Sequence, residues 1–398
     1  MGNKAMKIED ICKVSSSKRI FAREYVETGV PFWRGKEVTE HATGKNDSKG
    51  LFISAKRYNE LKQTGNVPSD DDVLITAVGT IGSIYQIKHE DLPFYFKDGN
   101  IIRLSNWNTD RVNPTYVSLF LRSQIGQQAI KEVEIGSTQK ALTIKDIAKV
   151  PILLPELKTQ NDIAAAIGVI DAKIKINQQI NKNLLKLSVL VFNKWLDSTQ
   201  SNQYTSLDKI ASFKNGIAMQ KFSPTDKIHV LPVIKIRELN QGYIDSNSDS
   251  VTSVIDDDVK VHNGDLVFSW SGTLSAKIWT DGDAALNQHL FKVTSNRWPK
   301  WFYYLWVLHH LNTFRGIAAD KKTTMGHIKR KDLTNAKVLI PNAKEFKNLD
   351  TILNPIIEQM VNGGIESKNL IDIRNILLPK LLSGSMDLSS IEETINND

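Results

Sequence analysis

The sequence has little cysteine and no long apolar run. Cys12 is the single cysteine among 398 residues, which excludes an internal disulfide and a zinc site built on several cysteines. No stretch reaches about 18 consecutive apolar residues, the length that crosses a membrane. The first residues also lack the apolar core of a signal peptide. These absences predict a protein of the cytoplasm.

The motifs of nucleotide-dependent and metal-dependent enzymes are missing as well. The sequence contains no phosphate-binding loop of the form G-x-x-x-x-G-K-[ST] and no glycine-rich dinucleotide fingerprint. His289, His309-His310 and His327 have no carboxylate or cysteine at metal-ligand spacing. We therefore expect no catalytic residue, no metal and no cofactor in this chain.

The composition is that of a basic globular chain. Hydrophobic residues make up 41% of the sequence and charged residues 24%, and 51 Lys and Arg against 44 Asp and Glu give a net charge of +7. This charge is compatible with a polyanionic partner, although composition alone does not identify one. The length exceeds one ordinary hydrophobic core and predicts two or three domains.

One unit is present twice along the chain. Three segments recur in the same order, at offsets that shrink along the sequence, so the second copy has shorter loops. The repeated unit spans nearly half of the chain, which is far too long for one repeat of a solenoid. It predicts two duplicated domains. The matched pairs are VPFWRGKEV (30–38) with LPVIKIREL (231–239), DVLITAVGTIG (72–82) with DLVFSWSGTLS (265–275), and GSTQKALTIKDIAKVPILLP (136–155) with KKTTMGHIKRKDLTNAKVLIP (321–341).

Each copy is followed by a segment with apolar residues at heptad spacing. Two matched stripes favour a coiled coil between the two helices over packing of each helix on its own domain. Polar Asn177 and Asn181 continue the first stripe and would fix its register. Pro355 should kink the second helix or mark a late start, and Gly363-Gly364 weaken it further. The stripe residues are Ile163, Ile167, Ile170, Ile174 and Leu184, then Leu349, Leu353, Ile356, Met360 and Leu370.

Within each copy, short apolar runs bounded by turn residues predict strands. Longer apolar segments that begin after a proline predict helices. Each domain is therefore expected to be mixed α+β. The predicted strands are 73–76, 101–104, 266–269 and 290–293, and the predicted helices are 116–130 and 301–315.

The loops carry side chains expected at a DNA surface. The segment 135–143 and its counterpart 321–331 are polar, threonine-rich and basic, and such loops supply hydrogen bonds to base edges and cations to phosphates. A Gly-Thr pair ends a buried strand in each copy, where a small residue lets the backbone approach a groove closely. Any one of these residues is more often an ordinary surface residue. Turns and loops that recur in both copies with different side chains, however, suit two domains that recognise different sequences. The candidate DNA-binding residues are Arg34, Lys36, Thr80, Ser83, Thr138, Gln139, Lys140, Lys235, Arg237, Thr273, Lys277, Lys321, Lys322, Thr323, Thr324 and His327.

One segment is similar to a catalytic motif. Asn113-Pro114-Thr115-Tyr116 resembles the Asn-Pro-Pro-Tyr signature by which amino-methyltransferases hold a flipped adenine. The second copy has Trp-Pro-Lys-Trp at the equivalent place, 298–301, and no glycine-rich cofactor loop lies upstream. The start of a helix is therefore the favoured interpretation.

The order of segments, the duplication and the helices together resemble the specificity subunit of Type I restriction–modification systems over nearly the whole chain. The resemblance is carried by DVLITAVGTIG with DLVFSWSGTLS, and by GSTQKALTIKDIAKVPILLP and KDLTNAKVLIP, each followed by a helix. It implies an α+β chain of two tandem target-recognition domains, each followed by a long helix, with the two helices pairing as an antiparallel coiled coil. The implied segments are 1–155 and 204–342 for the domains, 156–203 and 343–390 for the spacer helices, and 391–398 for a tail.

The same resemblance implies a function and partners. The chain would be a non-catalytic subunit that recognises double-stranded DNA, each domain binding one half of a bipartite target while the helices set the spacing. Two modification subunits would dock on the helices and supply the S-adenosylmethionine chemistry. Restriction subunits would join the full complex.

Three other interpretations stay open. The chain could be a recognition subunit of another multisubunit restriction system with the same folds. It could be a DNA adenine methyltransferase that uses residues 113–116, which methyl transfer by the isolated chain would support. It could also be a coiled-coil adaptor with two protein-binding domains, which salt-insensitive behaviour toward duplex DNA would favour.

Overall fold

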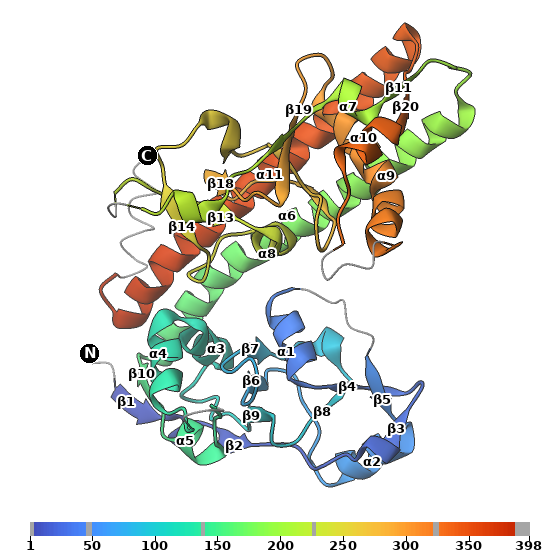
Figure 1. Cartoon of the computed structure of the whole chain (residues 1–398). Coiled ribbons are helices and arrows are strands. Elements are labelled where there is room, and N and C mark those ends of the chain that lie inside the picture. Colours follow the sequence, from blue (N-terminus) through green and yellow to red (C-terminus); the bar gives the residue numbers. More distant parts are fainter. Residues whose placement is uncertain (1–3, 45–49, 137–139, 225–227, 321–325, 387–398) are drawn as a thin grey trace. The chain divides into compact units, whose positions relative to one another are not determined.

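The chain forms two compact units. The computed structural model describes residues 4–44, 50–136, 140–224, 228–320 and 326–386. The first unit combines Met1–Ile170 with Ile373–Asp398, and the second comprises Asp171–Asp372. Each unit thus contains one repeated copy and part of each long helix (Figure 1). The segments expected from the sequence kept each helix whole.

The first unit holds two four-stranded sheets and a two-stranded ladder. The sheet β2-β9-β6-β7 is antiparallel, whereas β3-β5-β4-β8 contains one parallel pair, β4 with β8. Its strands are β1 (Lys4–Lys7), β2 (Lys13–Ser15), β3 (Tyr25–Val26), β4 (Val30–Trp33), β5 (Leu51–Ile53), β6 (Val73–Thr76), β7 (Ile84–Gln86), β8 (Tyr95–Phe96), β9 (Ile101–Ser105) and β10 (Pro151–Leu154). Its short helices are α1 (Gly35–Ala42), α2 (Ala55–Gln63), α3 (Pro114–Arg122), α4 (Gln124–Glu132) and α5 (Ile144–Ala148).

The second unit repeats this plan with a different edge. The sheet β12-β19-β16-β17 is again antiparallel, and β14-β13-β18-β15 again has one parallel pair, β13 with β18. Its strands are β11 (Tyr204–Ser206), β12 (Ser212–Asn215), β13 (Val230–Ile234), β14 (Ser250–Thr252), β15 (Lys260–Val261), β16 (Leu266–Ser269), β17 (Ala276–Ile278), β18 (Ala284–Leu286), β19 (Leu290–Thr294) and β20 (Lys337–Leu339). Its other helices are α7 (Leu207–Ile210), α8 (Ile236–Gln241), α9 (Lys300–Asp320) and α10 (Arg330–Asn335).

The central sheet has the same order and register in both units. Leu74 of β6 lies opposite Arg103 of β9, and Val267 of β16 lies opposite Lys292 of β19. All residues of β6 and β16 are buried, which explains why their sequences are continuous apolar runs rather than alternating ones. Both strands have the predicted bounds, and β9 and β19 extend one residue further than predicted. The copies differ in the second sheet, where β3 lies outside β5 but β15 lies outside β18.

The helix predicted over 116–130 is broken in two. Ser123 separates α3 from α4: its Oγ donates to the Phe120 carbonyl at 2.6 Å and accepts from the Gly126 N–H at 3.2 Å. A Cβ on Gly126 would lie 2.0 Å from the same carbonyl oxygen, so the tight break requires glycine there. In the second copy α9 is one helix, longer than predicted at both ends.

The two long helices, α6 (Leu157–Ser198) and α11 (Ala343–Ser383), pair in antiparallel fashion (Figure 1). Within the second unit, Nδ2 of Asn177 donates to Oε2 of Glu366 at 2.7 Å, and Nδ2 of Asn181 donates to the Met360 carbonyl at 2.9 Å. A later residue of α6 therefore meets an earlier residue of α11. The predicted antiparallel coiled coil is confirmed, and its polar positions are hydrogen-bonded.

The late start expected for the second helix is wrong. Helix α11 runs without interruption through Pro355 and Gly363-Gly364. The glycines lie at close approaches: a Cβ on Gly363 would lie 3.0 Å from Oδ1 of Asn181, and one on Gly364 would lie 2.5 Å from Oγ1 of Thr280. Tertiary packing therefore outweighs the low helix propensity of these residues.

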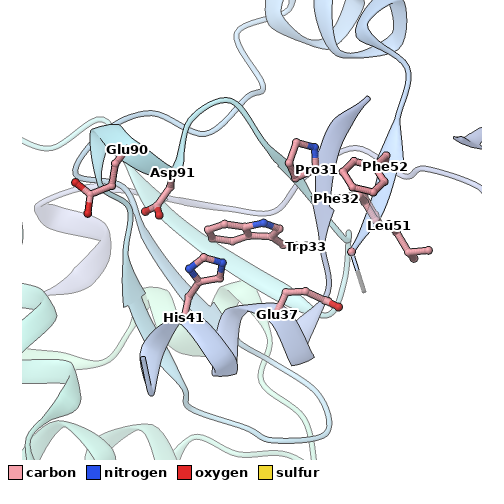
Figure 2. Close-up of a pocket in the computed structure, with 10 residues that line it drawn as sticks. Pro31, Phe32, Trp33, Glu37, His41, Leu51, Phe52, Glu90 and Asp91 are labelled. Atoms are coloured by element: carbon pink, nitrogen blue, oxygen red, sulfur yellow. The ribbon is translucent and has the colours of Figure 1, made fainter. Parts of the chain in front are cut away.

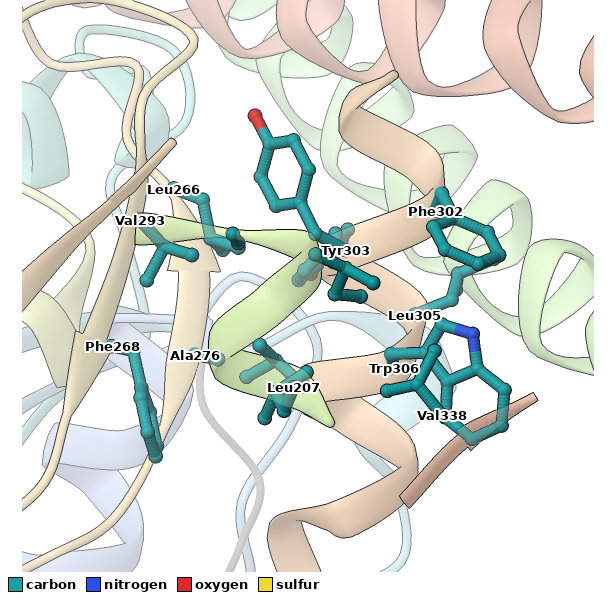
Figure 3. Packing of buried hydrophobic residues seen from close by; sticks show 14 of the residues in the cluster. Leu207, Leu266, Phe268, Ala276, Val293, Phe302, Tyr303, Leu305, Trp306 and Val338 are labelled. Atoms are coloured by element: carbon teal, nitrogen blue, oxygen red, sulfur yellow. The ribbon is translucent and has the colours of Figure 1, made fainter. Parts of the chain in front are cut away.

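Each unit has its own core, to which both long helices contribute. In the second unit, Phe302 and Trp306 of α9 pack in one cluster with Leu266 and Val293 of the central sheet (Figure 3). The first-unit core includes α6 residues near Ile163 and α11 residues near Leu381. Of the predicted stripe, the residues Ile163, Ile167, Ile174, Leu349 and Leu353 are buried, whereas Ile170, Leu184, Ile356, Met360 and Leu370 are half-buried. Ile357, which the heptad spacing missed, is 2% exposed.

Candidate nucleic-acid interface

The turns after β6 and β16 have the same construction. Gly79 and Gly272 adopt left-handed φ angles of 82° and 64°, a conformation that glycine reaches without strain. In the first unit, Oγ1 of Thr76 donates to the Thr80 carbonyl and accepts from the Ser83 N–H at 2.9 Å. The predicted site residues Thr80 and Thr273 therefore lie on tight, preorganised turns.

In both units this turn lies against the predicted threonine-rich loop. The Leu142 N–H donates to the Ala77 carbonyl at 2.9 Å, and the Gly272 N–H donates to the Gly326 carbonyl at 2.8 Å. Bridges also join Val78 to Ala141 and Ser271 to His327. The structure thus brings Thr80 near the loop that holds Lys140, and Thr273 near His327. The predicted residues Thr138, Gln139, Lys321, Lys322, Thr323 and Thr324 lie outside the described residues.

A helix supports each turn, and this feature was missed by the sequence reasoning. In the first unit, Nε2 of Gln127 on α4 donates to the Gly82 carbonyl at 3.0 Å. In the second, Nε and Nη2 of Arg315 on α9 donate to the Leu274 carbonyl at 3.2 and 3.1 Å. Between α4 and its turn lies an open cavity of about 360 Å³. It is lined by Ile81, Gly82, Gln124, Gln127, Gln128, Ile130, Lys131 and Glu134.

Two predicted arginines neutralise buried carboxylates. Nη2 of Arg34 lies 2.6 Å from Oε1 of Glu37, and Nη2 of Arg237 lies 2.6 Å from Oε1 of Glu238, while the two glutamates are 4% and 1% exposed. Burial acts to raise the pKa of Glu37, but hydrogen bonds from Arg34 hold it below its ordinary value. Each arginine therefore has a structural role beside any contact with DNA, which stays a prediction.

The remaining predicted residues also have partners within the chain. Nζ of Lys140 lies 2.9 Å from Oε2 of Glu134. Lys36 pairs with Glu40 at 3.6 Å, and Nζ of Lys277 donates to the Asn240 carbonyl at 2.6 Å. The other two contacts are an ion pair of Lys235 with Asp249 and a hydrogen bond from Thr39 Oγ1 to Ser83 Oγ at 3.1 Å.

The segment that resembles a methyltransferase motif caps a helix. Oδ1 of Asn113 accepts the N–H groups of Thr115 and Tyr116 at 2.8 and 3.3 Å. The Tyr116 ring is 0% exposed and its hydroxyl donates to the Leu153 carbonyl at 2.9 Å. A ring buried in this way cannot stack on a flipped base, so the structure supports the helix-start interpretation.

A second cavity, of about 370 Å³, lies in the first unit beside Trp33 (Figure 2). Trp33 stacks on Phe94 and His41 with ring centroids 3.7 and 3.9 Å apart, and burial lowers the pKa of His41. The cavity is lined by Pro31, Phe32, Trp33, Glu37, His41, Gly50, Leu51, Phe52, Glu90 and Asp91. Although Arg34 neutralises Glu37, the carboxylates of Glu90 and Asp91 at this cavity disfavour a phosphate backbone. The amide-rich cavity beside α4 is therefore the better candidate for DNA contact.

Comparison with known proteins identifies the family. The profile described as the Type I restriction modification DNA specificity domain matches residues 2–186 and 201–368. The chain belongs to this family. It carries two specificity domains, which correspond to the two copies found in the sequence, and the predicted resemblance is confirmed.

Individual relatives agree with the family. The chain is 21% identical over 423 residues to the Type I restriction enzyme MjaIX specificity subunit of Methanocaldococcus jannaschii, covering 97% of this chain and 94% of that one. It is 27% identical over 154 residues to the Type I restriction enzyme EcoBI specificity subunit of Escherichia coli, covering 37% of this chain and 31% of that one. The crystal structure of a Type I restriction–modification S subunit from M. genitalium has a TM-score of 0.54 at 12% identity, covering 95% of both chains. This last likeness supports the fold.

In this member of the family, α6 presents a second apolar stripe to solvent. In the second unit Ile176, Ile180, Leu187 and Leu190 are between 41% and 66% exposed, at spacings of four, seven and three residues. An exposed apolar row on a paired helix is typical of a surface that another protein covers.

Among the described residues, no cluster of three or more His, Cys, Asp or Glu side chains could hold a metal ion. No helix in the described part of the chain is long and apolar enough to cross a membrane.

Proposed function

We propose that the chain is the DNA-recognition subunit of a Type I restriction–modification enzyme and has no catalytic activity of its own. Each specificity domain binds one half of a bipartite duplex target. The paired helices α6 and α11 set the distance between the halves.

The observation that carries this proposal is an arrangement of turn, helix and loop that is common to both units but presents different side chains in each. Both units build the same turn after the central strand, support it from a helix and place a polar loop beside it. The side chains presented on that frame differ between the copies. Two domains of this kind on antiparallel helices suit a duplex, because its two strands are related by a two-fold axis.

The modification subunits are the proposed partners of the exposed stripe on α6. The four apolar residues from Ile176 to Leu190 would be covered on assembly. S-adenosylmethionine would bind to those partners rather than to this chain. Restriction subunits would join the assembled enzyme.

The test is sequencing of methylated bases in cells that produce this chain together with its modification subunits. We expect one bipartite motif, methylated in both halves. Exchange of residues 204–342 for the same span of a relative should change one half and leave the other intact. A change in both halves, or in neither, would contradict the assignment of one half to each domain. The purified chain alone should transfer no methyl group to duplex DNA.

A further inference from the structure

The helix that supports each turn presents a polar face of its own. On α4, Gln124, Gln128 and Lys131 are all exposed, and their spacing of four and three residues places them on one side of the helix. This face borders the cavity beside the turn. Gln127 lies one turn from Gln124 and Lys131 on the same side of α4 and holds the turn after β6, while Ile130 anchors the helix in the core.

Hydrogen-bonding capacity remains on this face. Nε2 of Gln128 donates to Oε1 of Glu132 at 3.0 Å, which leaves the amide oxygen as an acceptor. The Gln124 side chain has no hydrogen-bond partner among the described residues. A free amide can both donate to and accept from one base edge, the pattern by which glutamine recognises adenine in the major groove.

The second unit presents different side chains at the same place. Arg315, which holds the turn after β16, also donates from Nη1 to Oδ1 of Asn312 at 3.1 Å. Asn312 and Thr313 are exposed beside it on α9. The turn and its supporting helix are thus common to both copies, whereas the exposed groups change from two glutamines and a lysine to an asparagine and a threonine. Such a substitution pattern is what two domains with different target bases require.

We propose that this helix face contacts base edges and helps to determine sequence specificity, through Gln124, Gln128 and Lys131 in the first domain and Asn312 in the second. The inference rests on the proposed function and adds residues that the threonine-rich loops do not include. Duplex DNA fits the face better than a protein partner does, because its amide and ammonium groups outnumber the carboxylates of Glu132 and Glu134. The neighbouring turn and loop add Thr80 and Lys140.

The experiment uses the full chain in complex with its modification subunits. Binding is measured to a duplex with the bipartite motif that methylation sequencing identifies. It is also measured to duplexes in which one base pair of that motif is substituted. In Gln124→Ala and Gln128→Ala, discrimination at one base pair of one half-site should fall by roughly tenfold or more. Asn312→Ala should relax one position of the other half-site. Lys131→Ala should either relax one position or, if the lysine contacts phosphate, lower the salt slope by about one unit for all duplexes.

A matched control is Gln63→Ala, at the exposed end of α2 in the same unit, which should leave discrimination unchanged. Alanine is favoured in helices, so these variants should keep the stability of the parent, as thermal melting will show. Gln128→Glu preserves the size of the side chain and should shift preference toward cytosine, whose amino group a carboxylate accepts.

Unchanged discrimination in both glutamine variants and in Asn312→Ala would overturn the inference. So would variants that lose their modification subunits while their discrimination stays intact, since the face would then contact protein. A parent complex that methylates no bipartite motif would instead refute the proposed function itself. The two failures are therefore distinguishable.

Discussion

Arg103 and Asp72 form a buried ion pair beside the central sheet of the first unit. Nε of Arg103 lies 3.1 Å from Oδ2 of Asp72, with the two side chains 8% and 4% exposed. The second unit has Lys292 and Asp265 at the equivalent positions, 2.9 Å apart but 14% and 23% exposed. The duplication therefore includes an internal ion pair, which is less exposed to solvent in the first copy.

The first prediction concerns the loss of the cation. Arg103→Ala should destabilise the first unit by about 3–5 kcal/mol, because it leaves a buried carboxylate without its counter-ion. Lys292→Ala is the matched variant: each cation also donates to a backbone carbonyl, at 2.7 and 2.8 Å respectively. We expect a smaller loss there, since water reaches Asp265. Urea denaturation with hydrogen exchange of β6 and β16 measures both, and equal losses would contradict the argument.

The second prediction is a pH dependence. Burial raises the pKa of Asp72 to about 6, against the attraction of Arg103, whereas an unfolded aspartate titrates near about 3.9. The folded state thus holds this proton more tightly, so the stability it contributes is complete below about pH 4 and is lost as the pH rises to about 6. The loss should be at most about 3 kcal/mol. Asp72→Asn should flatten the stability of the first unit between pH 4 and 7, measured by hydrogen exchange of β6. The same slope in parent and variant would refute it.

The central strands could be predicted from the sequence, but the helix breaks could not. Continuous apolar runs such as Val73–Thr76 mark strands buried on both faces, and that signal is local. The break at Ser123 depends on how closely Gly126 approaches the Phe120 carbonyl. The spacing of apolar residues in the sequence does not reveal such an approach. Propensity was also misleading at Gly363-Gly364, where contacts from distant residues determine the outcome.

The third prediction tests one of these contacts. Gly364→Ala should destabilise the second unit by about 1–3 kcal/mol, because the new methyl group would overlap the Thr280 side chain. Thr280→Ala in the same chain should restore part of that loss, since it removes two of the three clashing atoms. Urea denaturation of the single and double variants measures the coupling. An alanine at 364 that stabilises the helix would show that the approach is looser than described.

The fourth prediction uses the helices as a spacer and rests on the proposed function. Insertion of one heptad after Ile170 in α6 and another before Ile373 in α11 falls between the two compact units and keeps the antiparallel partners in register. Each helix gains roughly 10 Å, equivalent to about three base pairs. The methylated motif should keep both half-sites and show a longer gap. A heptad in α6 alone should displace Ile163 and Ile167 from Leu381 in the core of the first unit and impair assembly. An altered half-site with an unchanged gap would rule out the spacer role.

The fifth prediction concerns Lys140. Lys140→Ala should weaken DNA binding uniformly across sequences and lower the salt slope by about one unit, if the ammonium contacts phosphate. Glu134→Gln removes the carboxylate 2.9 Å from that ammonium and should strengthen binding slightly, with a steeper slope. Binding of the assembled complex to duplex DNA at several salt concentrations measures both variants. Identical slopes in parent and variants would place the phosphate contacts elsewhere.

The candidate site could be predicted only in part. Sequence patterns located the Gly-Thr turns because a turn after a buried strand has a local signature. They could not show that Arg34 and Arg237 each face a buried glutamate, because the sequence does not reveal whether a nearby glutamate is buried or exposed. The polar face of α4 was missed because its significance comes from Gln127, which joins it to a turn far away in the sequence.

The division of each long helix between the units has a consequence for synthesis on the ribosome. The core of the first unit needs Leu381 and its neighbours from the end of α11, so the domain that is translated first is completed last. The second unit, Asp171–Asp372, is translated in between. At a translation rate of about 5–20 residues per second, roughly ten to forty seconds pass between the synthesis of Ile163 and Ile167 and that of their partners in α11. During that interval the nascent chain exposes an apolar surface to chaperones and to other nascent chains.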